Sequence, residues 1–149
     1  MGDGIIGRCV QFRVYGNPEG KKAIQFVRRT GFARQPRGDW FNLVHAAAVK
    51  AKDGLKAPLD GNIEVVVSYI IKRPKYMTTK KMLGEILCNK KPDIDNLLKG
   101  DFDAITHSGL WADDSRVWGV TARKQWSDET HQPGAHFRIM VPDHIDAEQ

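Results

Sequence analysis

The sequence predicts an α+β fold, with a single small domain spanning residues 1–149. Four segments show the two-residue hydrophobic alternation of half-buried strands, and two show the 3.6-residue period of amphipathic helices. Their order is strand, helix, strand, helix, strand, strand, which is typical of two main helices packed on a mixed or antiparallel sheet of about four strands. A chain of 149 residues, 41% of them hydrophobic, suffices for one core and is short for two.

The first half of the chain predicts one strand and one helix. Hydrophobic residues alternate with polar ones over residues 10–14, which indicates a strand with one buried face. A helix follows, with Asp39 as its N-cap and Gly54 as its C-terminal stop. The residues that fall on its apolar stripe are Trp40, Val44, Ala47 and Ala51.

The second half begins with the most regular strand, over residues 63–71, which we expect at the centre of the sheet because both of its faces carry apolar residues. A helix is predicted over 96–105, with Asp95 or Asn96 capping its start. Two more strands are expected over 116–125 and 136–141. The residues expected to share a face in these three elements are Leu98, Phe102 and Ile105; Trp118, Val120 and Ala122; and Phe137, Ile139 and Val141.

Composition narrows the partners and the compartment. The formal net charge of +5 favours a polyanionic partner, because lysines and arginines that contact phosphates release condensed counterions. Two cysteines without metal-ligand spacing indicate ordinary reduced thiols. No apolar stretch is long enough to span a bilayer, and the first residues lack signal-peptide organisation, so we expect a cytoplasmic protein.

Two segments concentrate the positive charge. Residues 21–37 either form a basic ribbon or ordered loop, or are a solvated surface loop. Residues 72–91 contain seven lysines and arginines and one acidic residue, and this basic loop either stays mobile or lies along phosphates.

Asp93 and Asp95 form the first acidic group with a chemical meaning. Two residues apart in an extended segment, their side chains project from the same side and can reach one ion, and oxygen ligands of this kind suit magnesium or manganese. The alternative is purely structural, because Asp-x-Asp-Asn before a helix is also a good capping sequence.

A second acidic pair, Asp113-Asp114, follows about one helix and one turn later. A turn around Gly109 would return it beside the first pair, and crowded carboxylates need a cation to offset their repulsion. Lys99 stands one helical turn after Asp95, where its ammonium could contact a phosphate or instead pair with Asp103. An EF-hand is excluded, because Leu98 and Ala104 occupy the positions that need Gly and Glu.

Residues 91–99, 102–105 and 109–117 together resemble the core of RusA-type Holliday-junction resolvases in the order and spacing of both acidic groups. The resemblance implies a homodimer that places paired nicks in four-way DNA junctions, in DNA recombination and repair. It also implies a catalytic lysine at Lys99 and magnesium ligands at Asp93, Asp95 and Asp114, with Asp113 as a supporting carboxylate. The residues expected to position the DNA backbone are Lys72, Arg73, Lys75, Lys90, Lys91 and Lys124.

Three other functions remain open on the sequence. A nuclease of this kind could act on flaps, forks or other branched DNA, because the segments that depart from the family pattern, residues 20–38 and 72–91, bear on substrate preference. A non-catalytic DNA-binding protein would use the acidic residues only as caps. A divalent-ion module without a DNA role is disfavoured by the basic residues directly beside the carboxylates.

Overall fold

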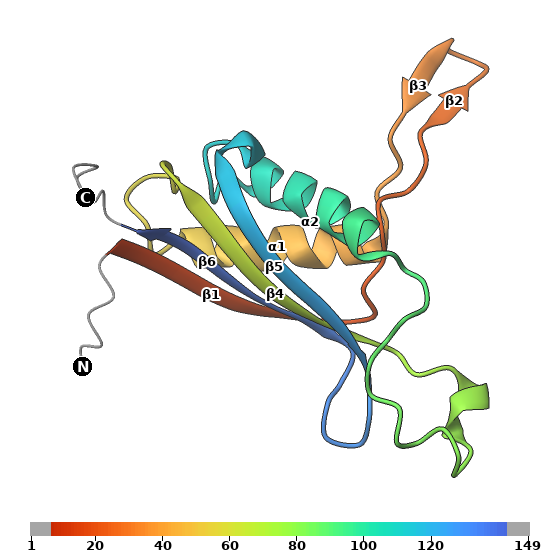
Figure 1. The fold of residues 1–149 in the computed structure, drawn as a ribbon. Helices are drawn as coiled ribbons and strands as arrows, with labels where there is room; N and C mark the ends of the chain where they lie inside the picture. The colour runs from red at the N-terminus through yellow and green to blue at the C-terminus, as the bar shows by residue number, and fades with distance from the viewer. Residues whose placement is uncertain (1–6, 143–149) are drawn as a thin grey trace.

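The computed structural model describes residues 7–142, and its central feature is a four-stranded mixed sheet in the order β1-β6-β4-β5 (Figure 1). The strands are β1 (Gly7–Tyr15), β4 (Ile63–Ile71), β5 (Val117–Trp126) and β6 (Gly134–Pro142). β6 pairs antiparallel with β1 and β4, whereas β4 pairs parallel with β5. The predicted fold class is therefore confirmed, and the strand over 63–71 is central as expected.

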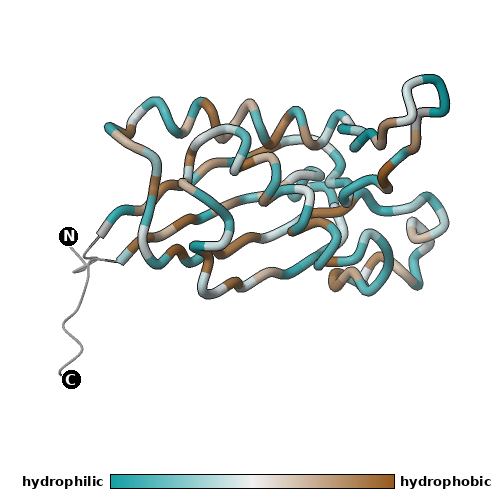
Figure 2. Tube along the Cα trace, turned by 90° about the horizontal axis from the view of Figure 1, so that it is seen from above, coloured by the Kyte–Doolittle hydropathy of each residue, from teal (hydrophilic) through white to brown (hydrophobic). Residues whose placement is uncertain are grey.

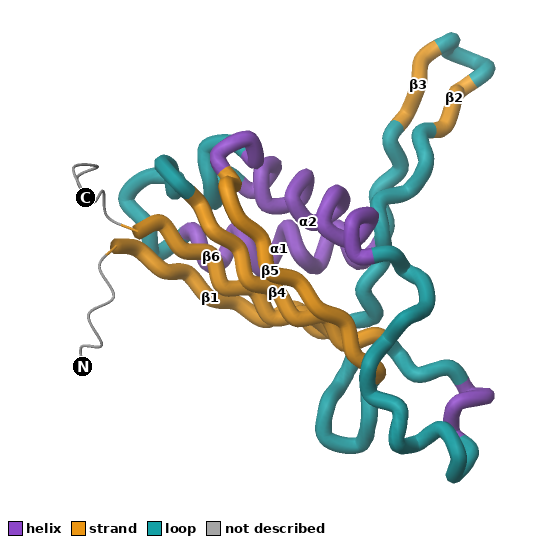
Figure 3. The backbone as a smooth tube through the Cα atoms, in the orientation of Figure 1, coloured by secondary structure: helices purple, strands orange, loops and turns teal. Residues whose placement is uncertain are grey.

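Both long helices cover the same face of this sheet (Figures 1 and 3). They are α1 (Asp39–Lys52) and α2 (Ile94–Ser108), and Figure 2 shows hydrophobic and hydrophilic residues alternating along them. The buried side chains of β4 alternate strictly with half-buried ones, as the two-residue period predicts. The fully buried core lies between this face and the helices, and its largest members include Trp111, Tyr69, Phe137, Leu97 and Ile105.

Helix ends differ from the sequence prediction. The N-cap of α1 is Gly38, so Asp39 lies inside the first turn, and the helix stops at Lys52 with Asp53 as C-cap, one residue before Gly54. Asp39 still lies at the end of the helix that favours negative charge. On the stripe, Trp40 and Val44 are buried as predicted, but Ala48 is the third buried residue, and Ala47 and Ala51 are only partly buried.

Edge position explains a second difference, in β5. The register pairs Val120 with Val65 and Ala122 with Val67, so the predicted apolar face of β5 does point to the helix side. Trp118 and Val120 nevertheless stay 65% and 42% exposed. β5 is an edge strand, and the register irregularity between Ile63 and Glu64 leaves Trp118 without a paired residue in β4. Periodicity identifies the face of a strand, but it does not show how far the helices extend over it.

Two segments project from the end of the molecule where β4 ends and α2 begins (Figures 1 and 2). One contains a separate two-stranded sheet, β2 (Gln25–Val27) and β3 (Phe32–Arg34), so the ribbon interpretation of residues 21–37 is confirmed. The other is the basic segment 72–91, which contains one short 3-10 helix, η1 (Lys75–Thr78). A second 3-10 turn, η2 (Asp114–Arg116), leads into β5.

Candidate nuclease site

Asp93 and Asp95 stand at the start of α2, and neither is used to cap it. Asp93 occupies the N-cap position with extended backbone, so the prediction of Asp95 or Asn96 there is wrong, and its side chain makes no capping hydrogen bond. Asp95 lies in the first turn. Both side chains are exposed. Asn96 instead donates from its Nδ2 to the carbonyl of Lys21, 3.2 Å away. The carboxylates are therefore free for a ligand.

A groove along α2 brings together several of the predicted residues. Asp95, Lys99 and Asp103 lie four residues apart on one face of the helix, and Asp114 joins them from η2. Leu98, Phe102 and Lys21 complete the lining of this groove, whose volume is about 290 Å³. Asp93 and Asp113 do not line it. The turn that returns the chain is made at Gly109, which is the C-cap of α2 and has a left-handed φ of 78°.

The charges in the groove are only partly balanced. Lys21 Nζ lies 2.8 Å from Asp103 Oδ2, and both side chains are half-buried. Partial burial raises the pKa of Asp114, and repulsion from Asp113 and Asp103 raises it further, while Lys21 lowers it. Lys99 forms no ion pair within residues 7–142, so its pairing with Asp103, the structural alternative, is replaced by the pair with Lys21.

Asp113 serves the turn that presents Asp114. Its carboxylate accepts from Ser115 Oγ at 2.6 Å and from the backbone N–H of Asp114 at 2.9 Å. The hydrogen bond from Ser115 is the main reason that the pKa of Asp113 lies below its ordinary value. Asp113 therefore stabilises the η2 turn and is not one of the residues that line the groove.

The donor set of the groove is chemically suited to a hard divalent cation, since carboxylate oxygens are the ligands that magnesium and manganese prefer. Over residues 7–142, no three His, Cys, Asp or Glu side chains stand close enough together to hold one ion in common. The sequence interpretation did not identify two of the groove residues, Lys21 and Asp103, as part of the site. Asp103 had a signal, because it lies eight residues after Asp95 on the same helical face.

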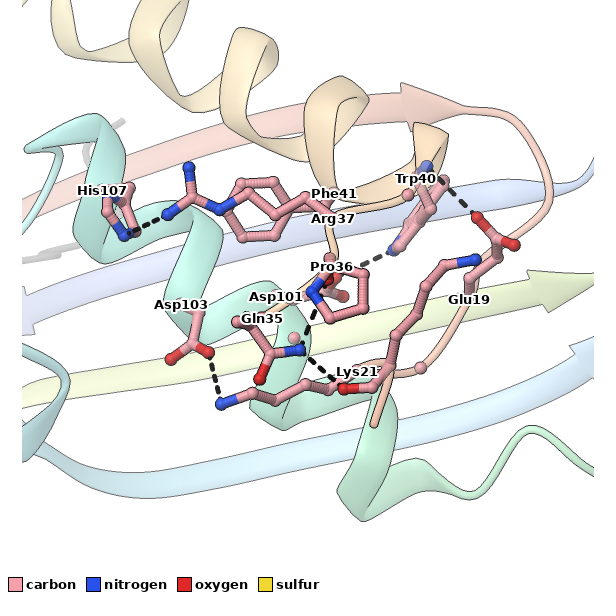
Figure 4. A pocket seen from close by; sticks show the side chains of 14 residues that line it. Glu19, Lys21, Gln35, Pro36, Arg37, Trp40, Phe41, Asp101, Asp103 and His107 are labelled. Atoms are coloured by element: carbon pink, nitrogen blue, oxygen red, sulfur yellow. Dashed lines mark hydrogen bonds and ion pairs between the residues drawn. The ribbon is translucent and has the colours of Figure 1, made fainter. Parts of the chain in front are cut away.

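The same helix, α2, also carries a buried carboxyl group. Asp101 is fully buried and accepts from Trp40 Nε1 at 2.8 Å and from the Tyr69 hydroxyl at 2.6 Å, so it links both helices to the central strand. Burial raises its pKa to about 7, although the two hydrogen bonds lower it. Figure 4 shows Asp101 and Trp40 beside a cavity of about 190 Å³ under the 21–37 segment. Sequence reasoning did not find this network.

The predicted DNA-backbone contacts fall into two groups. Lys72, Lys75, Lys90 and Lys91 are exposed, and no ammonium group among them has a protein partner in the part of the chain described. Arg73 and Lys124 make internal bonds instead. The Arg73 guanidinium donates to the carbonyls of Ser127, Met82 and Glu85. Lys124 Nζ donates to the carbonyls of Lys90 and Pro92 at 2.5 and 2.6 Å.

Comparison with known proteins identifies the family. Residues 16–139, most of the chain, match the family described as endodeoxyribonuclease RusA. The chain belongs to the RusA endodeoxyribonuclease family. Membership in the RusA family supports Holliday-junction resolvase activity in general, and with it binding to branched DNA. A relative named "Uncharacterized protein YqaN", from Bacillus subtilis (strain 168), is 27% identical over 129 aligned residues, and the match covers 81% of this chain and 90% of that protein. Within residues 7–142, no helix is long and apolar enough to cross a membrane.

Proposed function

We propose that this RusA-family chain is a magnesium-dependent endonuclease that resolves four-way DNA junctions by paired nicks. The observation that carries the proposal is the groove along α2, where Asp95, Asp114 and Lys99 meet beside a partly unbalanced negative charge. Asp95 and Asp114 would hold the cation, with Asp93 at the adjoining helix start and Asp113 fixing the turn. Because the side chains of Asp93 and Asp95 are exposed and do not cap the helix, their rotation can adjust the carboxylate oxygens to a ligand.

The chain's own residues then have distinct tasks in hydrolysis. A bound magnesium ion supplies polarisation of the phosphodiester and a lower pKa for the attacking water, and manganese is a plausible substitute. Lys99, which has no ion-pair partner among residues 7–142, contacts the scissile phosphate and stabilises the charge that develops on it. Lys21 holds Asp103 at the edge of the groove and limits the repulsion on Asp114.

The wider role follows from the symmetry of the substrate. A four-way junction has two equivalent strands to cut, and two-fold substrates favour two-fold proteins, so the working form is a homodimer. Its place is DNA recombination and repair in the cytoplasm. Lys72, Lys75, Lys90 and Lys91 position the phosphate backbone, which fixes register without reading bases.

Cleavage by an Asp95→Asn variant tests the site. The amide keeps the shape of the side chain and removes the charge that holds a cation, so we expect junction binding to persist and cleavage to be lost. The assay uses a labelled four-way junction and a matched linear duplex, with magnesium or with chelator. Asp53→Asn, the same change at an exposed position beyond the C-terminus of α1, is the control and should cut normally.

Each alternative has its own outcome in the same assay. Unchanged cleavage by Asp95→Asn contradicts the metal site. If the wild-type protein binds the junction but does not cut it with any divalent ion, the chain is a non-catalytic DNA-binding protein. Faster cutting of flaps or forks than of the four-way junction keeps the nuclease and changes its substrate.

A further inference from the structure

The β2–β3 hairpin, which with its stems we call the arm (residues 21–37), has no hydrophobic core of its own. It forms a sheet separate from the main one and extends away from the body (Figures 1 and 3). Three of its apolar side chains are largely exposed: Ile24 at 66%, Phe26 at 68% and Phe32 at 74%. Isolated two-stranded hairpins are marginally stable in water, so exposed aromatic rings here need a reason beyond the stability of the hairpin.

The arm is also strongly basic. It contains no acidic residue, and six of its seventeen residues, counted from 21 to 37, are lysine or arginine. The six are Lys21, Lys22, Arg28, Arg29, Arg34 and Arg37. Figure 2 shows hydrophobic stretches along the arm and a hydrophilic tip. This combination of cations and aromatic rings is suited to nucleic acid, since every base has a face on which an aromatic ring can stack.

The register of the hairpin places one aromatic ring on each of its faces. Phe26 is paired with Ala33, so these two residues share a face. Phe32 is next to Ala33 in the chain, and successive residues of a strand point to opposite faces, so Phe32 lies on the other side. Neither face is a buried face, because both rings are exposed.

The base of the arm is fixed to the helix that carries the nuclease groove. Lys21 donates its backbone N–H to the carbonyl of Asn96 at 3.1 Å and accepts from Asn96 Nδ2, while its ammonium pairs with Asp103. Gln35 Nε2 ties the second stem to the first through the carbonyl of Lys22 at 2.6 Å. Figure 4 shows these stem residues over α2. Because Asn96 is next to Asp95, the position of the arm is set relative to the groove.

Close packing at two glycines supports this attachment. A Cβ atom at Gly20 would collide with the side chain of Asn96, and one at Gly100 would lie 3.3 Å from the backbone nitrogen of Lys21. The base of the arm therefore packs on α2 at a site where the two backbones approach closely. A ligand that contacts the tip of the arm is held in a defined place with respect to Asp95 and Lys99.

We propose that the arm enters the branch point of junction DNA, where Phe26 and Phe32 stack on bases unstacked at the crossover and Arg28, Arg29 and Arg34 contact the adjoining phosphates. This inference rests on the proposed function and deepens it, because it names the element that distinguishes branched from linear DNA. A two-stranded ribbon fits the major groove, and apolar side chains inserted between base steps are a known way of holding distorted DNA. Bases in a linear duplex are already stacked, so the rings gain less there.

A second copy of the chain is the less favoured occupant of the arm. Two arms in contact would bring together six guanidinium groups, those of Arg28, Arg29 and Arg34 from each copy, on chains that each carry a formal charge of +5. Like charges across an interface oppose association. Phosphates neutralise the same cations. The charge of the arm therefore selects DNA over a self-contact.

The test compares three double variants in DNA binding with chelator present, so that cleavage plays no part. Phe26→Ala/Phe32→Ala should weaken four-way-junction binding by about tenfold or more, because stacking on one base alone is worth about a factor of ten. Binding of the matched linear duplex should change by less than about twofold. Phe26→Leu/Phe32→Leu keeps apolar bulk without an aromatic face and should lose binding nearly as fully. Leu43→Ala/Val49→Ala, which removes exposed apolar side chains from α1, is the control and should bind normally.

Photo-crosslinking gives the position directly. Wild-type protein is irradiated on junctions that carry 5-iodouracil either at the crossover or in the middle of a junction arm. Crosslinks from the crossover should map to the peptide that contains Phe26 or Phe32, and those from the middle of a junction arm should not.

Three results would overturn the inference. The first is an unchanged junction affinity of the alanine variant, and the second is an equal loss of affinity for junction and duplex. The third is a leucine variant that binds the junction normally and sediments as a dimer when the alanine variant does neither, which would make a second copy of the chain the partner of the arm. Failure here is distinct from failure of the nuclease proposal. A wild type that cuts junctions with a dispensable arm refutes only this inference, and one that binds through the arm without cutting refutes only the nuclease.

Discussion

Within residues 7–142, Asp101 is the carboxylic acid side chain that the fold buries completely. Its carboxyl group is fully buried between α2, α1 and β4, and its two protein donors are neutral, the indole of Trp40 and the hydroxyl of Tyr69. Burial penalises the charged form of a carboxyl group and of a phenol alike, which is why the pKa of Asp101 rises to about 7 and that of Tyr69 lies well above its ordinary value. The negative form of Asp101 also opposes ionisation of Tyr69.

This environment predicts a stability that falls with rising pH. Folded Asp101 keeps its proton up to about pH 7, whereas the unfolded carboxyl loses it near 3.8, so between these values the folded state binds more protons. The free energy of unfolding therefore falls as the pH rises through that window, by a total on the order of 4 kcal/mol. In urea unfolding, we expect the stability of Asp101→Asn relative to wild type to increase from pH 4 to pH 7.

A companion variant identifies the cause. Tyr69→Phe removes a hydrogen bond that lowers the pKa of Asp101, so the pH dependence should persist and move to higher pH. A difference between Asp101→Asn and wild type that stays constant from pH 4 to 7 would mean that Asp101 is ionised in the folded protein throughout.

At the scale of the elements, the sequence predicted what depends on local periodicity. The four strands of the main sheet and both long helices were predicted because their core residues recur every two or every 3.6 positions. Helix caps were less accurate, since Asp39 and Gly54 are good caps by residue type but Gly38 and Asp53 take those places. The exposure of Trp118 was missed, because it depends on the position of β5 at the sheet edge and on the irregular register at this residue.

The candidate site shows the same division. Asp95, Lys99 and Asp114 were predicted from their order and spacing, and the groove brings these three together. Lys21 could not be predicted, because it lies 74 positions before Asp95 and reaches the groove only through packing of the arm on α2. Asp101 gives no signal in the sequence either, since its burial depends on Trp40 and Tyr69 from two other elements.

Lys124 is expected to hold the segment before α2 in place. Its ammonium donates to the carbonyls of Lys90 and Pro92, so it ties β5 to the residues that lead into Asp93. Hydrogen bonds from a charged donor contribute more than neutral ones, and Lys124→Met should lower the free energy of unfolding by about 2 kcal/mol. Urea denaturation measures the change, and hydrogen exchange should show faster opening over residues 86–92.

Lys90→Met is the matched control, because that ammonium is exposed and has no protein partner in residues 7–142. Its effect on stability should stay within about 0.5 kcal/mol. Equal stabilities for the two variants would show that the two hydrogen bonds of Lys124 contribute nothing, and the lysine would then be free to contact phosphate as the family resemblance implies.

The whole molecule has its projecting basic segments at one end. The arm and residues 72–91 both leave the end of the sheet where α2 begins, and the start of α2 lies between them (Figure 1). Several residues of α2, among them Asp95 in its first turn, line the groove. Positive charge distributed in this way concentrates the attraction for phosphates near the candidate site. The net charge of +5 alone would not specify any face.

Salt dependence of binding tests whether position or net charge matters. Each phosphate contact releases condensed counterions, so Lys90→Gln/Lys91→Gln should reduce the slope of log affinity against log salt by about 2 on junction and duplex DNA alike. Lys50→Gln/Lys56→Gln removes the same two charges from exposed positions at the C-terminal end of α1 and the loop that follows it. Because both variants have a formal charge of +3, by subtraction of two from +5, a net-charge effect would reduce both slopes equally. If the slope is reduced for the Lys90/Lys91 variant and not for the Lys50/Lys56 variant, the DNA lies against the end of the molecule that carries the arm and the groove. If the slope is unaltered for the Lys90/Lys91 variant, residues 90 and 91 are part of an ordinary solvated surface.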